Sequence, residues 1–231
     1  MFNIIINHIL DILPYYVIFE SFYCITKKTF SDFNTIYFML HFIVNLINTI
    51  LILPYINILI QDPLIFLQQS TINSTDLTNH DLINLNIIYP MVIGLHTFHL
   101  IHHLNKIKYD EFIHHTLTHT FWYIVYLANN PIYIIPMIGM SGIPGGITYL
   151  LLFLNKFNYI SLICEKKISM YLNIWLRAPL CIIFTPLLYI QSLENNLFYE
   201  TLFMIAFTMI NGIHFMHNIT ESYYNKTLNN N

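Results

Sequence analysis

The chain has 231 residues, of which 56% are hydrophobic and only 9% are charged. A soluble domain carries about 25% charged residues, so this composition excludes an ordinary water-facing surface. The formal net charge of −3 argues against nucleic acid as a partner. The three cysteines, Cys24, Cys164 and Cys181, lie in or beside apolar runs and predict neither a disulfide framework nor a zinc site.

Seven apolar runs follow one another along the chain, and most have the roughly 20 residues that a helix needs to cross the hydrocarbon core. They cover residues 4–25, 33–60, 82–104, 112–128, 131–154, 168–190 and 197–217. Only helices and closed barrels satisfy their backbone in lipid, and these runs are too long for barrel strands. We therefore expect an all-α polytopic membrane protein with about seven transmembrane helices, a single domain over residues 1–231 and a cytosolic tail at 219–231.

Basic residues mark alternate connections between these runs. Lysines follow the first, third, fifth and seventh runs, whereas the loops after the second, fourth and sixth contain no Lys or Arg. The lysines are Lys27, Lys28, Lys106, Lys108, Lys156, Lys166, Lys167 and Lys226. By the positive-inside rule this alternation predicts a lumenal N-terminus and a cytosolic C-terminus. A glycosylation sequon at Asn73 falls in a loop that is lumenal on this topology.

Histidines are concentrated on the third and fourth runs, where helical spacing sorts them into stripes. The third run carries His96, His99 and His103 on one stripe, with His102 beside it. The fourth run carries two neighbouring stripes, namely Glu111, His115 and His119, and Asp110, His114 and Thr118. A carboxylate one turn before a histidine can orient its ring as a general base. The alternative is that the histidines only fasten helices together through hydrogen bonds.

The stretch Lys106-Ile-Lys108-Tyr-Asp110-Glu-Phe-Ile-His114-His115-Thr-Leu-Thr118 resembles the signature of the TLC domain family (TRAM, LAG1 and CLN8 homology). Ceramide synthases of that family join a fatty acyl group from acyl-CoA to the amine of a sphingoid base. The resemblance implies a TLC-like core over about residues 82–218, catalytic roles for His114, His115 and Asp110, and acyl-CoA as co-substrate without a bound cofactor or metal. Substrate binding is expected at His99, His103, Thr118, His119 and Arg177.

The chain also departs from the pattern of the ceramide synthases. The acidic-Ser-Thr-Pro stretch of ceramide synthases is replaced by Ser141-Gly-Ile-Pro144-Gly-Gly. The later segments Glu165-Lys-Lys and Asn173-Ile-Trp175-Leu-Arg177-Ala-Pro179 are more similar to uncharacterised TLC-like proteins of protists and large DNA viruses. Because the family also has members without an agreed enzymatic activity, a lipid-sensing or structural membrane protein is the alternative function.

Metal chemistry gives a second alternative. Membrane di-iron hydroxylases and desaturases bind iron through histidine boxes, since imidazole suits iron. The spacings of His115 and His119, and of His99, His102 and His103, match two such boxes, and the latter also matches the box of fatty-acid elongases. A third box at His214 and His217 lacks its final histidine.

Further polar groups fall inside the predicted spans. Arg177 needs a partner at membrane depth, for which Asp11, Glu20 and Glu200 are candidates, and a structural ion pair is favoured over contact with a lipid headgroup. His41, Asn45 and Asn48 form a stripe that predicts inter-helix contacts. The glycine-rich residues 139–146 predict a helix break that lines a cavity or a close helix crossing.

Together these patterns predict a lipid-handling membrane protein of TLC type whose partners are membrane lipids. The endoplasmic reticulum is the expected location, or a host membrane if the chain is viral, and the sequence leaves homo-oligomerisation open.

Overall fold

The computed structural model describes residues 2–30, 32–61, 79–105, 107, 109–128, 131–194 and 198–228. Regular secondary structure within these residues is entirely helical, which confirms the predicted all-α class. Each of the seven apolar runs forms one helical rod, and the fifth and sixth rods join α-helix to π-helix.

Each rod overlaps its predicted run, with differences at some of the ends. They are α1 (Phe2–Thr26), α2 (Phe33–Gln61), α3 (Asn79–His103), α4 (Tyr109–Ala128), the π-helix η2 (Ile138–Gly142) continuing into α5 (Ile143–Lys156), α6 (Leu162–Leu172) continuing through the π-helix η3 (Asn173–Arg177) into α7 (Ala178–Glu194), and α8 (Phe198–Leu228). A short 3₁₀-helix, η1 (Pro131–Ile134), precedes η2.

Five helical segments of the described chain are long and apolar enough to cross a membrane. They are Ile6–Thr26, Phe33–Gln61, Ile138–Lys156, Leu162–Ile190 and Phe198–Leu228. Helices α3 and α4 have 25 and 20 residues but are more polar, because the histidine stripes lie on them. The membrane-embedded character of the fold therefore stands on five helices, and the count of seven spans remains a prediction.

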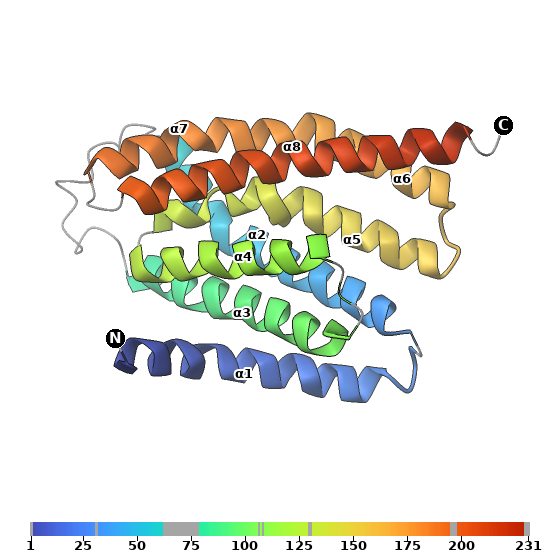
Figure 1. The fold of residues 1–231 in the computed structure, drawn as a ribbon, viewed down its shortest axis with the longest axis horizontal. Coiled ribbons are helices and arrows are strands. Elements are labelled where there is room, and N and C mark those ends of the chain that lie inside the picture. Colours follow the sequence, from blue (N-terminus) through green and yellow to red (C-terminus); the bar gives the residue numbers. More distant parts are fainter. Residues whose placement is uncertain are drawn as a thin grey trace.

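Consecutive rods run in opposite directions along the bundle (Figure 1). Helices α1, α3 and α5 finish at the same end of the bundle as the C-terminus, and α4 and α7 finish at the other end, where the N-terminus lies. The described lysines belong to the first of these ends, which we call the lysine end: Lys27 and Lys28 after α1, Lys156 in α5, Lys166 and Lys167 in α6, and Lys226 in α8. Lys106, Lys108 and the Asn73 sequon lie outside the described residues.

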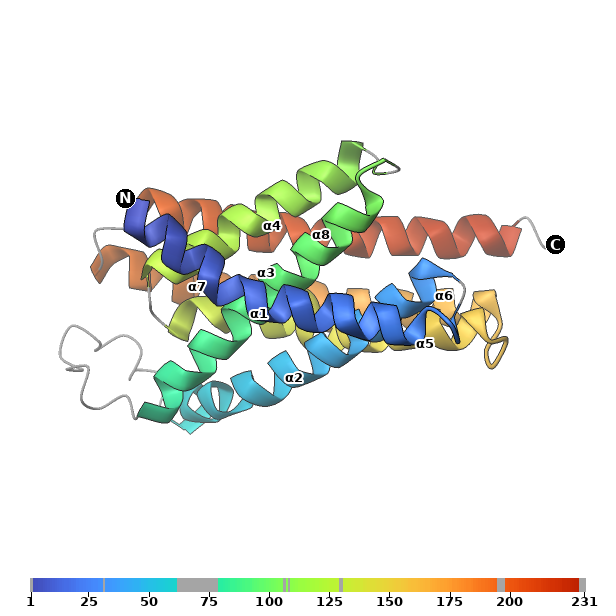
Figure 2. The ribbon, with the colours of Figure 1, turned by 90° about the horizontal axis from the view of Figure 1, so that it is seen from below.

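The core lies between α2, α3, α4, η2 and α7, and α1 is peripheral. The largest fully buried side chains include Trp122, Tyr55, Tyr133, Phe98 and Phe121. Helix α1 packs chiefly against α3 and crosses its outer side (Figure 2). Phe19 is the one buried side chain among those described in α1. Outward-facing residues elsewhere are apolar and exposed, as for Trp175 at 74%, which fits a surface that faces lipid.

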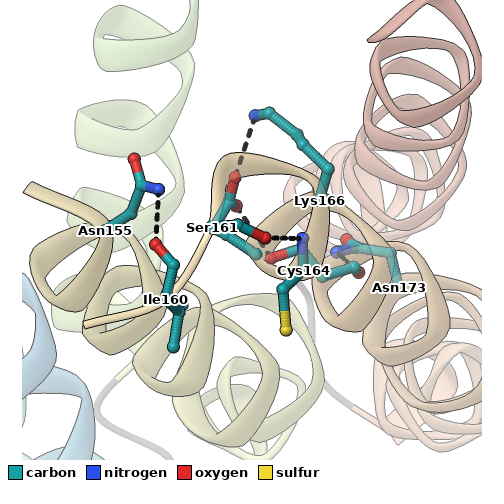
Figure 3. Close-up of polar contacts among 8 residues, drawn as sticks. Asn155, Ile160, Ser161, Cys164, Lys166 and Asn173 are labelled. Atoms are coloured by element: carbon teal, nitrogen blue, oxygen red, sulfur yellow. Dashed lines mark hydrogen bonds and ion pairs between the residues drawn. The ribbon is translucent and has the colours of Figure 1, made fainter. Parts of the chain in front are cut away.

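Two rods extend further than the sequence predicted. The sixth begins at Leu162 rather than at residue 168, because Ser161 Oγ accepts a hydrogen bond from the Cys164 amide at 3.2 Å and caps the helix (Figure 3). The Asn155 side chain donates to the Ile160 carbonyl at 3.0 Å and fixes the preceding corner (Figure 3). At the other end of the chain, α8 continues to residue 228, so most of the predicted tail is helical.

The glycine-rich break is a π-helix that leads into α5. A Cβ atom on Gly139 would lie 2.7 Å from Leu180 Cβ, so the backbones can approach this closely only because the residue is glycine. Ser141 and Gly145 lie on the wall of a cavity. The segment thus serves in both of the roles predicted for it.

Asp32 joins the α1–α2 turn to α5 at the lysine end. Lys156 Nζ donates to Asp32 Oδ2 at 2.8 Å, and this hydrogen bond is the main cause that lowers the pKa of Asp32 below its ordinary value of 3.8. A carboxyl with a lowered folded-state pKa stabilises the protein above its ordinary pKa and loses that effect as the pH falls through the lowered value. Both side chains are more than 40% exposed, at 43% and 44%, so the contribution is small.

We therefore expect Asp32→Asn to lower the melting temperature slightly at neutral pH and to have no effect once the pH is below the lowered pKa. Thermal unfolding in detergent across this range measures the difference, and Lys156→Gln should give the same profile. A loss of stability that is equally large in acid would contradict the assignment.

Candidate functional site

The histidine stripes meet where α3 and α4 pack against each other as antiparallel neighbours. The Nδ1 atoms of His96 and His115 are 3.1 Å apart, so one ring donates a hydrogen bond to the other. The ring centre of His99 lies 4.8 Å from that of His115. His99 and His115 are only 8% and 4% exposed, so the imidazoles of the two helices face each other inside the bundle.

His119 fastens the same two helices together. Its Nδ1 lies 2.8 Å from the backbone oxygen of His115, and a carbonyl only accepts, so Nδ1 carries the proton. In the neutral ring Nε2 is then an acceptor, and the Thr97 hydroxyl donates to it at 3.3 Å. Both ring nitrogens of His119 are thereby engaged in helix-to-helix or intrahelical bonds.

Helices α2 and α5 complete the histidine cluster with residues that sequence reasoning did not assign to a site. The Tyr37 ring lies 4.1 Å from that of His99, and His41 lies 5.8 Å from His96. From α5, Tyr149 stacks on His41 at 4.4 Å, and its hydroxyl is 3.3 Å from that of Tyr37. His41 was predicted as an inter-helix contact, and it is one, but it also lines a cavity.

This cavity has a volume of about 390 Å³, within the range of small-molecule sites. It lies beside the histidine cluster and is bordered by α2, α3, α4, η2, α5, α6, η3 and α8. Its apolar wall includes Val92, Leu95, Phe121, Trp122, Met137 and Phe207. Its polar wall includes His41, Asn45, His96, His114, Tyr149 and Arg177. Such a space suits a ligand with one apolar and one polar part.

The predicted catalytic residues occupy different positions relative to this cavity. His114 lies on its wall, with its ring centre 5.9 Å from that of Phe215. His115 lies behind the wall, against His96 and His99. Asp110 belongs to the first turn of α4, but its side chain lies outside the described residues. Of the histidine pair, His114 is therefore the one that can touch a ligand.

The predicted substrate-binding residues divide in the same way. Thr118 and Arg177 line the cavity. His99 and His119 lie in the cluster behind it, and the His103 ring packs against the ring of His99 at 4.7 Å. The latter three residues therefore support the wall rather than form it.

Arg177 has neutral partners, which corrects the predicted ion pair. It is 5% exposed, its Nη1 donates to Asn173 Oδ1 at 2.9 Å, and its Cζ lies 4.7 Å from the ring centre of Phe215. None of the three predicted carboxylates contacts it within the described chain. One of them, Glu20, instead accepts from His102 Nε2 at 2.8 Å.

Arg177 is the last member of a buried polar ladder that sequence reasoning missed. The Ser169 hydroxyl donates to Glu165 Oε1 at 3.1 Å, and Asn173 Nδ2 donates to the Ser169 carbonyl at 2.7 Å. Lys166 Nζ lies 3.5 Å from the second oxygen of Glu165 (Figure 3). The four-residue spacing from Glu165 to Arg177 placed all members on one face of the sixth rod.

Members of two of the di-iron boxes meet, because the His99 ring lies 4.8 Å from that of His115 and 4.7 Å from that of His103. His102 binds Glu20 on α1, whereas His115 faces α3, and His214 contacts the Asn218 side chain at 2.9 Å on an exposed part of α8. No group of three or more His, Cys, Asp or Glu side chains in the described chain is arranged to hold a metal ion.

The resemblance to the TLC signature depends on residues 106–118, of which Lys106 and Lys108 lie outside the described residues. The part that the structure describes, from Tyr109 to Thr118, forms the first half of α4 and carries His114 to the cavity. Membership of that family remains a prediction, because a comparison of the chain with protein-family models, curated proteins and solved structures found no match.

Proposed function

We propose that the chain crosses the membrane seven times, with its lysine end in the cytosol, and that it binds a lipid in the central cavity. The activity that we propose for it is N-acyl transfer from acyl-CoA to an amine of the sphingoid-base type. The TLC-like core that would perform it is about residues 82–218.

The observation that carries lipid binding is the polarity gradient along the wall of the cavity. Helix α8 contributes Phe207, Asn211, Phe215, Asn218, Ile219 and Ser222 to that wall, mostly at the three- and four-residue spacing of one helical face. The span from Phe207 to Ser222 is fifteen residue steps, which is roughly 22 Å at 1.5 Å per residue. Toward the lysine end the wall carries Glu165, Lys166 and Ser222 beside Ile219, whereas Phe207 lies against the Phe121 ring at 5.5 Å. An amphiphile would therefore lie with its head toward the cytosol and its chain among the aromatic side chains.

Acyl transfer is supported by the imidazole that faces this space. In the proposed reaction the amine nitrogen attacks the thioester carbonyl, its proton passes to the His114 ring, the C–S bond breaks and the CoA thiolate leaves. The ring centre of His114 lies 5.6 Å from that of His115 and 6.1 Å from that of His96. Asp110, one turn earlier on α4, would orient His114, as the resemblance implies.

A non-catalytic lipid-binding protein is the second candidate, and a specific observation favours it. The contacts of His119 with Thr97 and of His102 with Glu20 join helices and leave little freedom for proton transfer. On this reading the whole cluster is structural, and the cavity alone carries the function.

Mass spectrometry of lipids that co-purify with the detergent-solubilised protein tests lipid binding, which both candidate functions require. We expect bound single-chain or ceramide-like lipids in the wild-type protein and a marked loss in Gly145→Leu, which fills the cavity. Asn225→Leu, on the C-terminal extension of α8 outside the cavity, is the control. Equal lipid in all three proteins would show that the cavity is not the binding site.

A further inference from the structure

The cavity carries one positive charge that no described acidic group neutralises. Its charged lining residues are Glu165, Lys166 and Arg177. Glu165 is 1% exposed and is occupied by Lys166 and by the Ser169 hydroxyl. It is also three helical turns away from Arg177, whose own contacts are an amide oxygen and an aromatic ring. Among the described residues the guanidinium therefore keeps its charge uncompensated, and its Nε has no hydrogen-bond partner there.

A second hydrogen-bond donor converges on the same point of the wall. Asn45 is 4% exposed and lines the cavity, and its Nδ2 is without a partner in the part of the chain that the structure describes. A Cβ atom on Gly145 would lie 3.3 Å from Asn45 Nδ2 and 3.4 Å from Arg177 Nη2. The two donors thus flank one glycine, and the missing side chain leaves room for an atom between them. Two donors around a small space, one of them cationic, form a cradle for an anion.

From this geometry we infer that Arg177 and Asn45 form an anion site, and that the lipid of the cavity is an amphiphile that bears a carboxylate or a phosphate. Its acidic oxygens would lie beside Gly145 and accept hydrogen bonds from Asn45 Nδ2 and Arg177 Nη2. Its chain would follow the apolar wall toward Phe121 and Phe207. The inference rests on the proposed lipid binding but does not depend on acyl transfer.

The test is displacement of a fluorescent fatty acid from the delipidated full-length protein in a neutral detergent. The competitors are alkyl compounds of one chain length that end in a carboxylate, a phosphate, a hydroxyl or an ammonium group, together with free acetate and inorganic phosphate. We expect the two acidic amphiphiles to bind about thirtyfold more tightly than the alcohol, as for a buried, hydrogen-bonded charge pair. The free anions should compete only weakly.

Two variants locate the effect. Arg177→Gln removes the charge, and Asn45→Asp places a carboxylate beside the guanidinium in the position of the ligand. Both should lose the preference for acidic heads and still bind the alcohol, which shows that they are folded. Lys167→Gln removes the same charge from an exposed position on α6 outside the cavity and should behave like the wild type.

Failure of the anion site and failure of lipid binding would give different results. Equal binding of acidic, neutral and basic amphiphiles, or an unchanged preference in Arg177→Gln, would overturn the anion site while leaving lipid binding intact. Competition by free phosphate at the same concentration as the alkyl phosphate would show a site for small anions instead of lipids. If no amphiphile displaces the probe, the proposed function fails together with this inference.

Discussion

Replacement of His114 by alanine is expected to reduce N-acyl transfer by about 10²–10⁴-fold, the usual loss when a general base is removed. His114 is the member of the histidine pair on the cavity wall, and Phe215 and His115 hold its ring in place. The other described imidazoles on the wall, His41 and His96, come from α2 and α3, and the ring centre of His96 is 6.1 Å from that of His114. Transfer of a labelled acyl group from acyl-CoA to sphingoid-type amines, in membranes that contain equal amounts of each variant, measures the loss.

His217→Ala is the matched control, because His217 is exposed on α8 outside the cavity. Its activity and melting temperature should equal those of the wild type. Lipid content separates the candidates further, since His114→Ala should still co-purify with lipid. A His114→Ala protein that transfers acyl groups at the wild-type rate would exclude this base and leave the non-catalytic function as the better explanation.

Replacement of Asn173 by leucine is expected to lower the free energy of unfolding by about 2–4 kcal/mol. Asn173 is fully buried, accepts from Arg177 Nη1 and donates to the Ser169 carbonyl. Leucine can do neither, so a buried cation would lose its acceptor while the apolar volume is kept. Unfolding in mixed micelles with a denaturing detergent gives the free energies.

A double variant makes this expectation specific. If the cost comes from the stranded guanidinium, Asn173→Leu combined with Arg177→Met should be less destabilising than Asn173→Leu alone. Trp175→Leu is the control on the same rod, because that side chain is exposed toward lipid and should change stability by less than about 0.5 kcal/mol. If the losses of unfolding free energy in Asn173→Leu and Arg177→Met simply add in the double variant, the contact between these two residues does not contribute to stability.

The helices could be predicted from sequence because each apolar run is long, and length alone decides between helix and strand in lipid. The beginning of α6 could not, since residues 162–167 are partly polar and the helix there depends on the Ser161 cap. The π-helical turns could not be predicted from the sequence either, although the glycines of residues 139–146 indicated the position of one of them. These errors all concern helix ends or local geometry, where hydropathy is a weak guide.

The site was predictable only in part. The meeting of α3 and α4 followed from their short connection, which fixed them as antiparallel neighbours. Tyr37, His41 and Tyr149 come from α2 and α5, and no sequence pattern says that these helices face the histidines. Carboxylate partners were predicted for Arg177 because a buried cation is usually paired with an anion, whereas in the fold it contacts Asn173 and Phe215. Which side of an apolar helix faces inward is decided by packing, and the sequence of one chain does not contain that information in readable form.

The peripheral position of α1 has a consequence for how the protein is made. Its principal partner, α3, emerges from the ribosome only after α2 and the long stretch that follows, and the Glu20–His102 contact joins the two. Until α3 has been made, α1 can form only its few contacts with α2, and its apolar surface suits it to lipid in the meantime. The packing of α1 therefore depends on a helix that the ribosome produces after it, with α2 in between.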